Sequence, residues 1–394
     1  MVAFLVLVVF LLSAYVLFFA MLGLWIPKFH KTDAGPGTQP DKSKFLIFVP
    51  AHNESGYLRP TLQSLHSLNY SREQFHIVVI ADNCTDDTAL IGKQEGCEVW
   101  ERIDPKLCGK GHALAWAFKA AQKLSYDAVV IIDADTTVSA NLLQVLDHEI
   151  RQSHLVIQVR YSFEFPMETS RWFRLISQAS KRSEDSFISR PRSRFRLYQG
   201  LQGNGFCLHH SVLEDVPWTA GSICEDLEYG LSLSEHGFSV HYVEDACVTA
   251  AMTGRLEHAS GQRQRWAGGT FALIVQRIPT LISQGIRRPD WRSIEACPYL
   301  ITLSRLPLVL LSAITASILL LEWHAASRPW LFVFCIAILM QVIYAIAMLS
   351  TTRNEHGFGK TLLGLPIYAV WLAYQQCASL LSLRNASWNR TERG

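Results

Sequence analysis

Hydrophobic and polar positions divide the chain into long apolar ends and an alternating middle. No charged side chain precedes Lys28, and apolar runs of similar length recur at about 298–321, 329–350 and 361–383. An α-helix rises about 1.5 Å per residue, so a run of this length can cross about 30 Å of hydrocarbon. The pattern predicts one N-terminal transmembrane helix and about three C-terminal helices that are transmembrane or membrane-associated.

The middle of the chain alternates between short apolar runs and helix-like stretches. The apolar runs cover 45–51, 75–81, 97–102 and 128–132, and the helix-like stretches cover about 55–67, 85–95 and 111–122. Near-continuous β-branched runs separated by helices are typical of a mostly parallel sheet covered on both faces. We therefore expect a Rossmann-like α/β domain, in which ligands bind beyond the carboxyl ends of the strands.

These patterns predict six consecutive segments. They are a transmembrane helix at 1–27, a polar linker at 28–44, a cytosolic α/β domain at 45–270, an interfacial segment at 271–297, membrane helices at 298–383 and a tail at 384–394. Basic residues after the first run favour a retained anchor with a cytoplasmic flank over a cleaved signal peptide. Three full C-terminal spans would put the basic tail outside, against the positive-inside tendency, so either the run at 361–383 does not cross the membrane or the tail breaks this rule.

Two further features allow two interpretations each. The stretch 167–188 can form an amphipathic helix on the membrane surface or a helix that faces the protein core. Arg305 lies about two turns inside the first C-terminal run. There it either extends its side chain to the interface or faces the acceptor path as a fixed cation.

Composition agrees with a membrane protein and argues against other classes. The chain has 394 residues, of which 49% are hydrophobic, and a formal net charge of +2. A charge so near zero offers no general attraction to nucleic acid. The 9 cysteines include no C-x-x-C pair, so neither a zinc knuckle nor a disulfide framework is predicted. We expect them to be reduced and mostly buried.

Polar motifs follow the predicted strands in order. They are VPAHNES at 49–55, ADNCTDDT at 81–88, DAD at 133–135, ED at 225–226 and QRQRW at 262–266. The set resembles the family-two inverting glycosyltransferases of the GT-A fold. Its membrane flanks resemble the membrane-embedded branch, with cellulose, chitin and hyaluronan synthases and the nodulation chitooligosaccharide synthases. The resemblance covers about residues 45–270 and implies a GT-A catalytic domain that takes a nucleotide-sugar donor.

The resemblance implies donor and metal residues at the ends of the strands. The matched donor positions are Pro50, Ala51, Asn53, Glu54, Asp82, Lys110 and Asp133. Among them, Asp82 matches an aspartate that reads the base, which is expected to be uracil. Asp135 matches the metal ligand. Two carboxylates two residues apart leave a strand end on the same side, which suits a divalent cation, Mg²⁺ or Mn²⁺. Asp86 and Asp87 are interpreted as helix-start residues outside the site.

Two glycine-containing turns are open to two interpretations. Lys110 lies at a helix N-terminus, where it can meet the anionic donor or remain a solvated residue of a surface turn. The turn of Gly203, Asn204 and Gly205 matches a loop that contacts the acceptor or the donor sugar. Its glycines would let the backbone approach a sugar closely. A plain turn before a strand is the alternative.

The ED motif carries the implied catalytic base. Glu225 is grouped with the acceptor site, and Asp226 matches the base of the family. An inverting transfer needs a carboxylate that takes the proton of the acceptor hydroxyl. Both acids also suit the first turn of the helix predicted at 227–235.

The Q-x-x-R-W motif consists of Gln262, Arg265 and Trp266. Arg265 would stabilise charge on the leaving diphosphate, and Trp266 would stack on a sugar or close the acceptor entrance. Elsewhere, an Arg-Trp pair before a membrane segment is an interfacial anchor. The preceding motifs favour catalysis.

The sequence thus predicts a multi-pass membrane glycosyltransferase whose catalytic domain faces the cytoplasm, at a bacterial inner membrane. Its expected partners are a UDP-sugar, membrane lipids and a lipid or glycan acceptor, with no nucleic acid. One alternative is a processive synthase that exports a β-linked polymer, with a partner subunit for export. Another is an inactive nucleotide-binding scaffold or sensor. About four spans are few for a polymer channel, which favours a single or short transfer.

Overall fold

The computed structural model describes residues 1–27, 43–252, 256–303, 305–322, 328–352 and 374, without the side chains of 256–266 and Leu306. The chain forms two compact units. The first comprises Met1–Pro27, Glu168–Pro191 and the described part of Arg263–Asn385. The second comprises the described parts of Lys28–Met167 and Arg192–Gln262. The predicted boundaries of the segment 45–270 stay a prediction, and the structure groups Glu168–Pro191 within it with the first unit.

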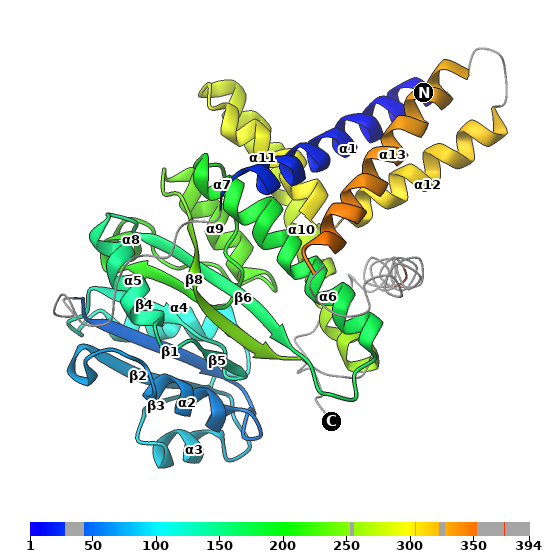
Figure 1. The fold of residues 1–394 in the computed structure, drawn as a ribbon. Helices are drawn as coiled ribbons and strands as arrows, with labels where there is room; N and C mark the ends of the chain where they lie inside the picture. Colours follow the sequence, from blue (N-terminus) through cyan, green and yellow to red (C-terminus); the bar gives the residue numbers. More distant parts are fainter. Residues whose placement is uncertain (28–42, 253–255, 304, 323–327, 353–373, 375–394) are drawn as a thin grey trace. The chain divides into compact units, whose positions relative to one another are not determined.

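The second unit is built on an 8-stranded mixed sheet (Figure 1). Its strands are β1 Phe45–Ala51, β2 Phe75–Asp82, β3 Glu98–Arg102, β4 Ala128–Ile131, β5 Thr136–Val138, β6 Val156–Glu164, β7 Phe206–His209 and β8 His241–Ala251. Their order across the sheet is β3-β2-β1-β4-β7-β6-β8-β5. The four strands expected from the apolar runs are β1 to β4, and they are parallel to one another. The predicted Rossmann-like, mostly parallel fold is confirmed.

Helices cover both faces of this sheet. They are α2 Leu58–His66, α3 Thr88–Gln94, α4 Lys110–Ala121, α5 Leu142–Arg151, α8 His210–Asp215 and α9 Glu225–Glu235. Buried side chains of α2 and α5 share one core with alternate residues of β1, and those of α4, α8 and α9 share a second core with the other residues of β1. In α2, Leu58, Leu62 and Leu65 lie on one helix face because they are four and three residues apart.

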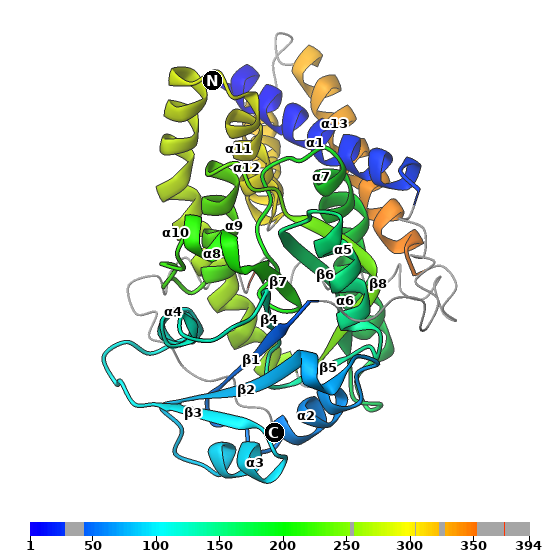
Figure 2. The ribbon, with the colours of Figure 1, turned by 90° about the vertical axis from the view of Figure 1, so that its left-hand side faces the viewer.

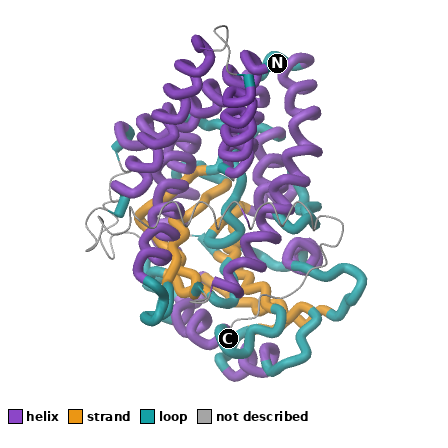
Figure 3. The backbone as a smooth tube through the Cα atoms, turned by 90° about the vertical axis from the view of Figure 1, so that its right-hand side faces the viewer, coloured by secondary structure: helices purple, strands orange, loops and turns teal. Residues whose placement is uncertain are grey.

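In the described residues of the first unit, every regular element is a helix, and Figure 3 draws helices in purple. They are α1 Val2–Trp25, α6 Arg171–Glu184, the π-helical turn η2 Asp185–Ser189, α11 Trp291–Leu303, α12 Leu306–Leu321 and α13 Arg328–Ser350, with most of α10 Leu256–Arg287. The short α7 Arg190–Arg194 and α10 each run from one unit into the other. Within the described residues, α1 and α13 are long and apolar enough to cross a membrane. The predicted run 361–383 lies outside the described residues, apart from Tyr374.

The apolar run predicted at 298–321 does not form one helix. It is divided between α11 and α12, which meet at a bend of 77° and count as one span only as a bent pair. Arg305 takes the left-handed conformation (φ 59°) before α12. Pro307, the second residue of α12, has no N–H to continue a preceding helix. The break is therefore encoded locally, although the hydrophobicity of the run conceals it.

Arg305 is held inside the helical unit by side-chain contacts. Its guanidinium donates to the Thr302 carbonyl at 2.6 Å and to the Tyr344 hydroxyl, and its Cζ lies 4.7 Å from the centre of the Tyr344 ring. This cation–π contact and the hydrogen bond hold the guanidinium against Tyr344 of α13. The charged group of Arg305 therefore has a partner within the protein and does not need to reach the membrane interface. The stretch 167–188 contains α6, whose Phe173 and Ile176 are buried, as the core-facing interpretation expects.

Candidate active site

The turns that carry the first three motifs lie at one edge of the sheet. The pairing is parallel, with Ala51 beside Ala81 and Phe48 beside Ile131, so β1, β2 and β4 end at the same edge. Figure 2 shows these strands side by side. Because polar residues follow each strand end, the expected convergence of the motifs is confirmed at the level of the backbone.

Two buried polar side chains hold the D-x-D turn. The Thr61 hydroxyl donates to the Ala134 carbonyl at 2.8 Å and accepts from the Thr136 amide at 3.0 Å. Asn204 Oδ1 accepts from the Asp133 amide at 3.1 Å, and Asn204 Nδ2 donates to the Thr136 hydroxyl at 2.8 Å. Thr61 and Asn204 are each 1% exposed. The turn is therefore fixed from both sides.

Replacement of Asn204 by alanine is expected to lower the free energy of unfolding by about 1–3 kcal/mol, because it leaves buried polar groups without partners. The donor site should also lose order, since the Asp133 amide loses its acceptor. Thermal denaturation of the purified protein measures the first effect. Asn69, whose side chain is exposed, gives the control Asn69→Ala, which should melt like the wild type. Equal melting of both variants would contradict the positioning role of Asn204.

Lys110 joins two of the turns, the D-x-D turn and the Gly203 turn. Its Nζ donates to Asp133 Oδ1 and to the Gly203 carbonyl. Gly203 has a φ of +76°, and a Cβ there would lie 2.7 Å from Asp226 Oδ2. Glycine is therefore required both for the conformation and for the approach of the carboxylate. Of the two interpretations of Lys110, the solvated surface residue is wrong: Lys110 lies between the D-x-D turn and the Gly203 turn.

The start of α9 adds two carboxylates beside Lys110. Asp226 Oδ1 accepts from the Leu227 amide at 2.8 Å, and Glu225 is buried. A Cβ on Gly111 would lie 3.1 Å from the Glu225 Cβ, so α4 and α9 begin in close contact. The helix predicted at 227–235 thus begins at Glu225, and both acids lie in its first turn as expected.

Burial and mutual repulsion control the charges of this group. Burial raises the pKa of Glu225, and the neighbouring charge of Asp226 raises it further. Burial likewise raises the pKa of Asp226, while the Leu227 amide and Lys110 lower it. Burial opposes the ammonium of Lys110, but the charges of Asp133 and Glu225 outweigh this effect and raise its pKa. The result is a cation that stays charged beside a carboxyl pair that binds a proton readily.

The predicted donor loop is fastened to the second motif. Asn53 Oδ1 accepts from the Thr85 amide at 2.7 Å, and the Glu54 amide donates to the Thr88 hydroxyl at 2.8 Å. Pro50 and Ala51 are the last residues of β1. These hydrogen bonds fix the two loops to each other. A nucleotide base bound by the donor loop would therefore contact a surface that is already ordered.

Asp82 ends β2 in a buried ion pair. Its Oδ1 accepts from Arg102 at 2.5 Å and from Asn83 at 3.2 Å, and its side chain is 5% exposed. Arg102 was not among the predicted site residues. In the sequence Arg102 is only a basic residue at the end of the predicted strand 97–102, and nothing there indicates its contact with Asp82. A role for Asp82 in reading a base stays a prediction.

Asp86 serves the structure of the loop, as interpreted from the sequence. It accepts from the Ser55 amide at 3.1 Å and from the Thr88 amide at 3.0 Å. Burial alone would raise the pKa of Asp86, but the hydrogen bonds from Thr88 and Ser55 lower it to about 2. The Asp86 carboxylate therefore stabilises the start of α3 and its contact with the loop at Ser55.

The last motif lies on a helix. The backbone of residues 262–266 belongs to α10, so Gln262 and Arg265 are three residues apart on one helix, as expected. The side chains of Gln262, Arg265 and Trp266 lie outside the described residues. Their catalytic roles stay predictions.

Comparison with known proteins identifies the family. A family model described as glycosyl transferase family group 2 matches residues 128–348. A beta-monoglucosyldiacylglycerol synthase of Nostoc sp. is 25% identical over 327 residues, which is 79% of this chain and 66% of that protein. A poly-beta-1,6-N-acetyl-D-glucosamine synthase of Staphylococcus aureus is 25% identical over 253 residues, 61% of this chain and 58% of that protein. The chain therefore spans less than two thirds of the length of these curated relatives.

The fold also occurs in a solved structure. A mannosyltransferase from Pyrobaculum calidifontis, in complex with GDP-Man and Mn²⁺, superposes with a TM-score of 0.54 at 17% identity. The match covers 98% of this chain and 100% of the other. At this identity the similarity establishes the GT-A fold and no more.

Proposed function

Because this chain belongs to glycosyl transferase family group 2, we propose that it transfers a sugar from a UDP-sugar to a membrane lipid or lipid-linked acceptor with inversion. The observation that carries the proposal is the contact of Lys110 with both Asp133 and the Gly203 turn, next to Asp226. Three segments distant in the sequence supply one cation and three carboxylates to a single site, and the Gly203 turn supplies a backbone carbonyl. Such a site suits a reaction in which a diphosphate leaves while a hydroxyl loses its proton.

Asp226 is the proposed base. The Leu227 amide holds Oδ1, and the missing side chain of Gly203 leaves room beside Oδ2. As the acceptor oxygen bonds to the anomeric carbon, its proton passes to Asp226. The bond from that carbon to the diphosphate breaks, and its electron pair leaves with the nucleotide. Lys110 and Arg265 are the proposed cations that stabilise this charge.

The residues of the D-x-D turn fit a divalent cation. Asp135 offers carboxylate oxygens from a turn that Thr61 and Asn204 hold in place, and Mg²⁺ and Mn²⁺ prefer such hard donors. We propose Asp135 as its ligand, with Asp133 directed to the nucleotide. When bound, the ion would neutralise part of the diphosphate charge. The relative from Pyrobaculum was solved with Mn²⁺, which supports this proposal.

The acceptor is proposed to be a lipid because apolar helices flank the catalytic domain in sequence. The name of the Nostoc relative, a glucosyldiacylglycerol synthase, supports a lipid acceptor, and that of the staphylococcal relative supports a polymer. The described residues hold 2 helices able to span a membrane, or 3 with the bent pair. With the run predicted at 361–383 the count would be about four, which is few for a polymer channel and favours a single or short transfer, with a partner subunit if a polymer is exported. The basic flank after α1 supports a cytoplasmic catalytic domain.

Nucleotide release tests this proposal. Purified protein in lipid would receive Mg²⁺ or Mn²⁺ and a panel of UDP-sugars plus GDP-mannose, with and without membrane lipid extract. We expect lipid-dependent release of UDP with one sugar, and mass spectrometry of the lipid would identify one added residue. A ladder of products would favour the processive synthase. Nucleotide binding without release from any donor would favour the inactive scaffold or sensor.

Replacement of Lys110 by methionine is expected to move the acid limb of the activity profile to higher pH. A base acts while it is ionised, so activity is lost as pH falls through its pKa. Lys110 lowers the pKa of Asp226, so its removal should raise that pKa and with it the pH at which activity is lost. The profile of kcat/KM against pH measures the shift. Lys119→Met, an exposed change on the same helix, is the control, and an unmoved limb in Lys110→Met would contradict the coupling.

A further inference from the structure

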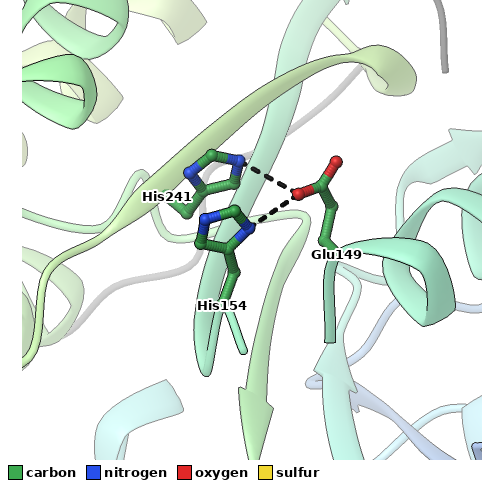
Figure 4. A group of neighbouring side chains, drawn as sticks. All are labelled: Glu149, His154 and His241. Atoms are coloured by element: carbon green, nitrogen blue, oxygen red, sulfur yellow. Dashed lines mark hydrogen bonds and ion pairs between the residues drawn. The ribbon is translucent and has the colours of Figure 1, made fainter. Parts of the chain in front are cut away.

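Three potential metal ligands meet far from the predicted motifs. Glu149 lies in the last turn of α5, His154 lies in the turn before β6, and His241 is the first residue of β8. His154 Nδ1 lies 2.8 Å and His241 Nε2 3.1 Å from the same oxygen, Glu149 Oε2. Figure 4 shows both rings directed at this atom from one side. Two imidazoles and a carboxylate are a ligand set of zinc sites.

This cluster lies at the opposite edge of the sheet from the catalytic turns. β7 is antiparallel to both β4 and β6, so β4 and β6 run in the same direction, and β8 runs parallel to β6. His154 and His241 stand at the starts of β6 and β8, whereas Asp133 follows the end of β4. The cluster is therefore separate from the D-x-D turn, and a metal there would be a different metal.

The cluster is also accessible. His154 and His241 line a cavity of about 300 Å³ whose wall includes Ser153, Arg194 and Ser239. Glu149 is buried, with 8% of its surface exposed. An ion can enter from the cavity, and a water molecule there can supply a fourth ligand.

We propose that Glu149, His154 and His241 form a binding site for one transition-metal ion of the Zn²⁺ type, with the fourth position open to the cavity. The two imidazoles select such an ion over Mg²⁺, which prefers oxygen. Ligands at about 2.0–2.1 Å around a tetrahedral zinc are roughly 3.3 Å apart. The nitrogen–oxygen separations of 2.8 and 3.1 Å are close to this spacing.

Metal entry requires two local changes. The two imidazole rings are stacked, with centres 3.6 Å apart and planes within 5°. The nitrogen lone pairs of stacked rings point in parallel directions, so one ring must rotate before both nitrogens can point at one metal ion. A proton on His154 Nδ1 or His241 Nε2 must also move to the other nitrogen of its ring. Both changes are confined to side chains. The bound ion would then link the end of α5 to the start of β8 and stabilise the folded domain.

Metal stoichiometry tests the proposal. The full-length protein in detergent would be stripped with chelator, dialysed against Zn²⁺ alone and analysed for bound metal. We expect the double variant His154→Gln/His241→Gln to retain one zinc fewer per chain than the wild type. His148→Gln, a change on the same helix as Glu149, should retain the wild-type number. Asp135→Asn should retain this zinc as well, which distinguishes it from the metal of the proposed transfer reaction.

Co²⁺ gives a second, spectroscopic measurement. The wild type and Asp135→Asn should show visible ligand-field absorption that the double variant lacks, and Zn²⁺ should raise the Tm of the first two only. Equal zinc content and equal Co²⁺ spectra in wild type and double variant would overturn the proposal. If the double variant fails to fold, as judged by circular dichroism, Glu149→Gln decides in the same way. Any zinc bound by cysteines is the same in the wild type and in every variant, so it does not affect the difference in zinc content between them.

Discussion

Asp226→Asn should reduce kcat by about 10²–10⁴-fold, the usual contribution of a general base, while donor binding remains near the wild-type level. Asparagine keeps the size of aspartate, and its amide oxygen can still accept from the Leu227 amide. It cannot take a proton from the acceptor hydroxyl. The loss should therefore appear in turnover and not in affinity for the nucleotide. Nucleotide release measures turnover, and titration with UDP measures binding.

A carboxylate in the same turn of α9 provides the control for this variant. Glu228 lies in the first turn of α9 with Asp226, and its Oε2 accepts from the Ser222 amide at 3.2 Å. Glu228→Gln removes one negative charge from the same first turn, and its activity should stay near the wild type. Turnover by Asp226→Asn within a few-fold of the wild type would refute the assignment of Asp226 as base. A comparable loss in both variants would point to the helix start and not to proton transfer.

Elements with strong local signals were predictable. The apolar runs of β1 to β4 are buried on both faces of a parallel sheet, so continuous hydrophobicity identified them. Their ends differed from the predicted ends by one residue at most. Asp86 was also interpreted correctly, because the start of a helix is a local feature with known preferences. Both features depend on residues that are adjacent in the sequence, so they can be predicted without knowledge of the fold.

Contacts between distant segments were not predictable in this way. Lys110 and Gly203 are 93 residues apart, and Asn204 and Asp133 are 71 apart. Nothing in either local pattern indicates the other partner. Asn204 was expected to contact a sugar, but its side chain is buried and bonds to the D-x-D turn. A sugar contact by that side chain would require it to give up these bonds.

Hydrophobicity also concealed one break in the chain. The run at 298–321 has the composition of one span, yet the structure divides it at Arg305 and Pro307. Apolar composition reports burial in lipid or protein, whereas helix continuity depends on backbone hydrogen bonds that proline removes. Pro307 is a local signal of the break, although a proline alone does not end a helix, since α10 contains Pro279 and α11 contains Pro298.

Asp135→Asn should remove the metal-dependent part of activity, a loss of at least about 10²-fold if the ion contributes several kcal/mol to the transition state. Chelator should stop the wild type, and added Mg²⁺ or Mn²⁺ should restore it but not the variant. The neutral amide keeps one oxygen but lacks the charge that holds a hard cation. Release of nucleotide across a metal titration provides the measurement.

Asp87→Asn is the matched control, because Asp87 is an exposed acid at the start of α3 that lies outside the proposed site. Its metal response should equal that of the wild type. If Asp135→Asn responded to Mg²⁺ or Mn²⁺ as the wild type does, Asp135 would not be the ligand. If it lost activity but the loss did not depend on metal concentration, the turn would serve the nucleotide directly. Activity that returned only at high metal concentration would show that Asp135→Asn weakens the metal site without abolishing it. Asp133 would then be the remaining carboxylate, and it would bind the ion weakly because it is already paired with Lys110.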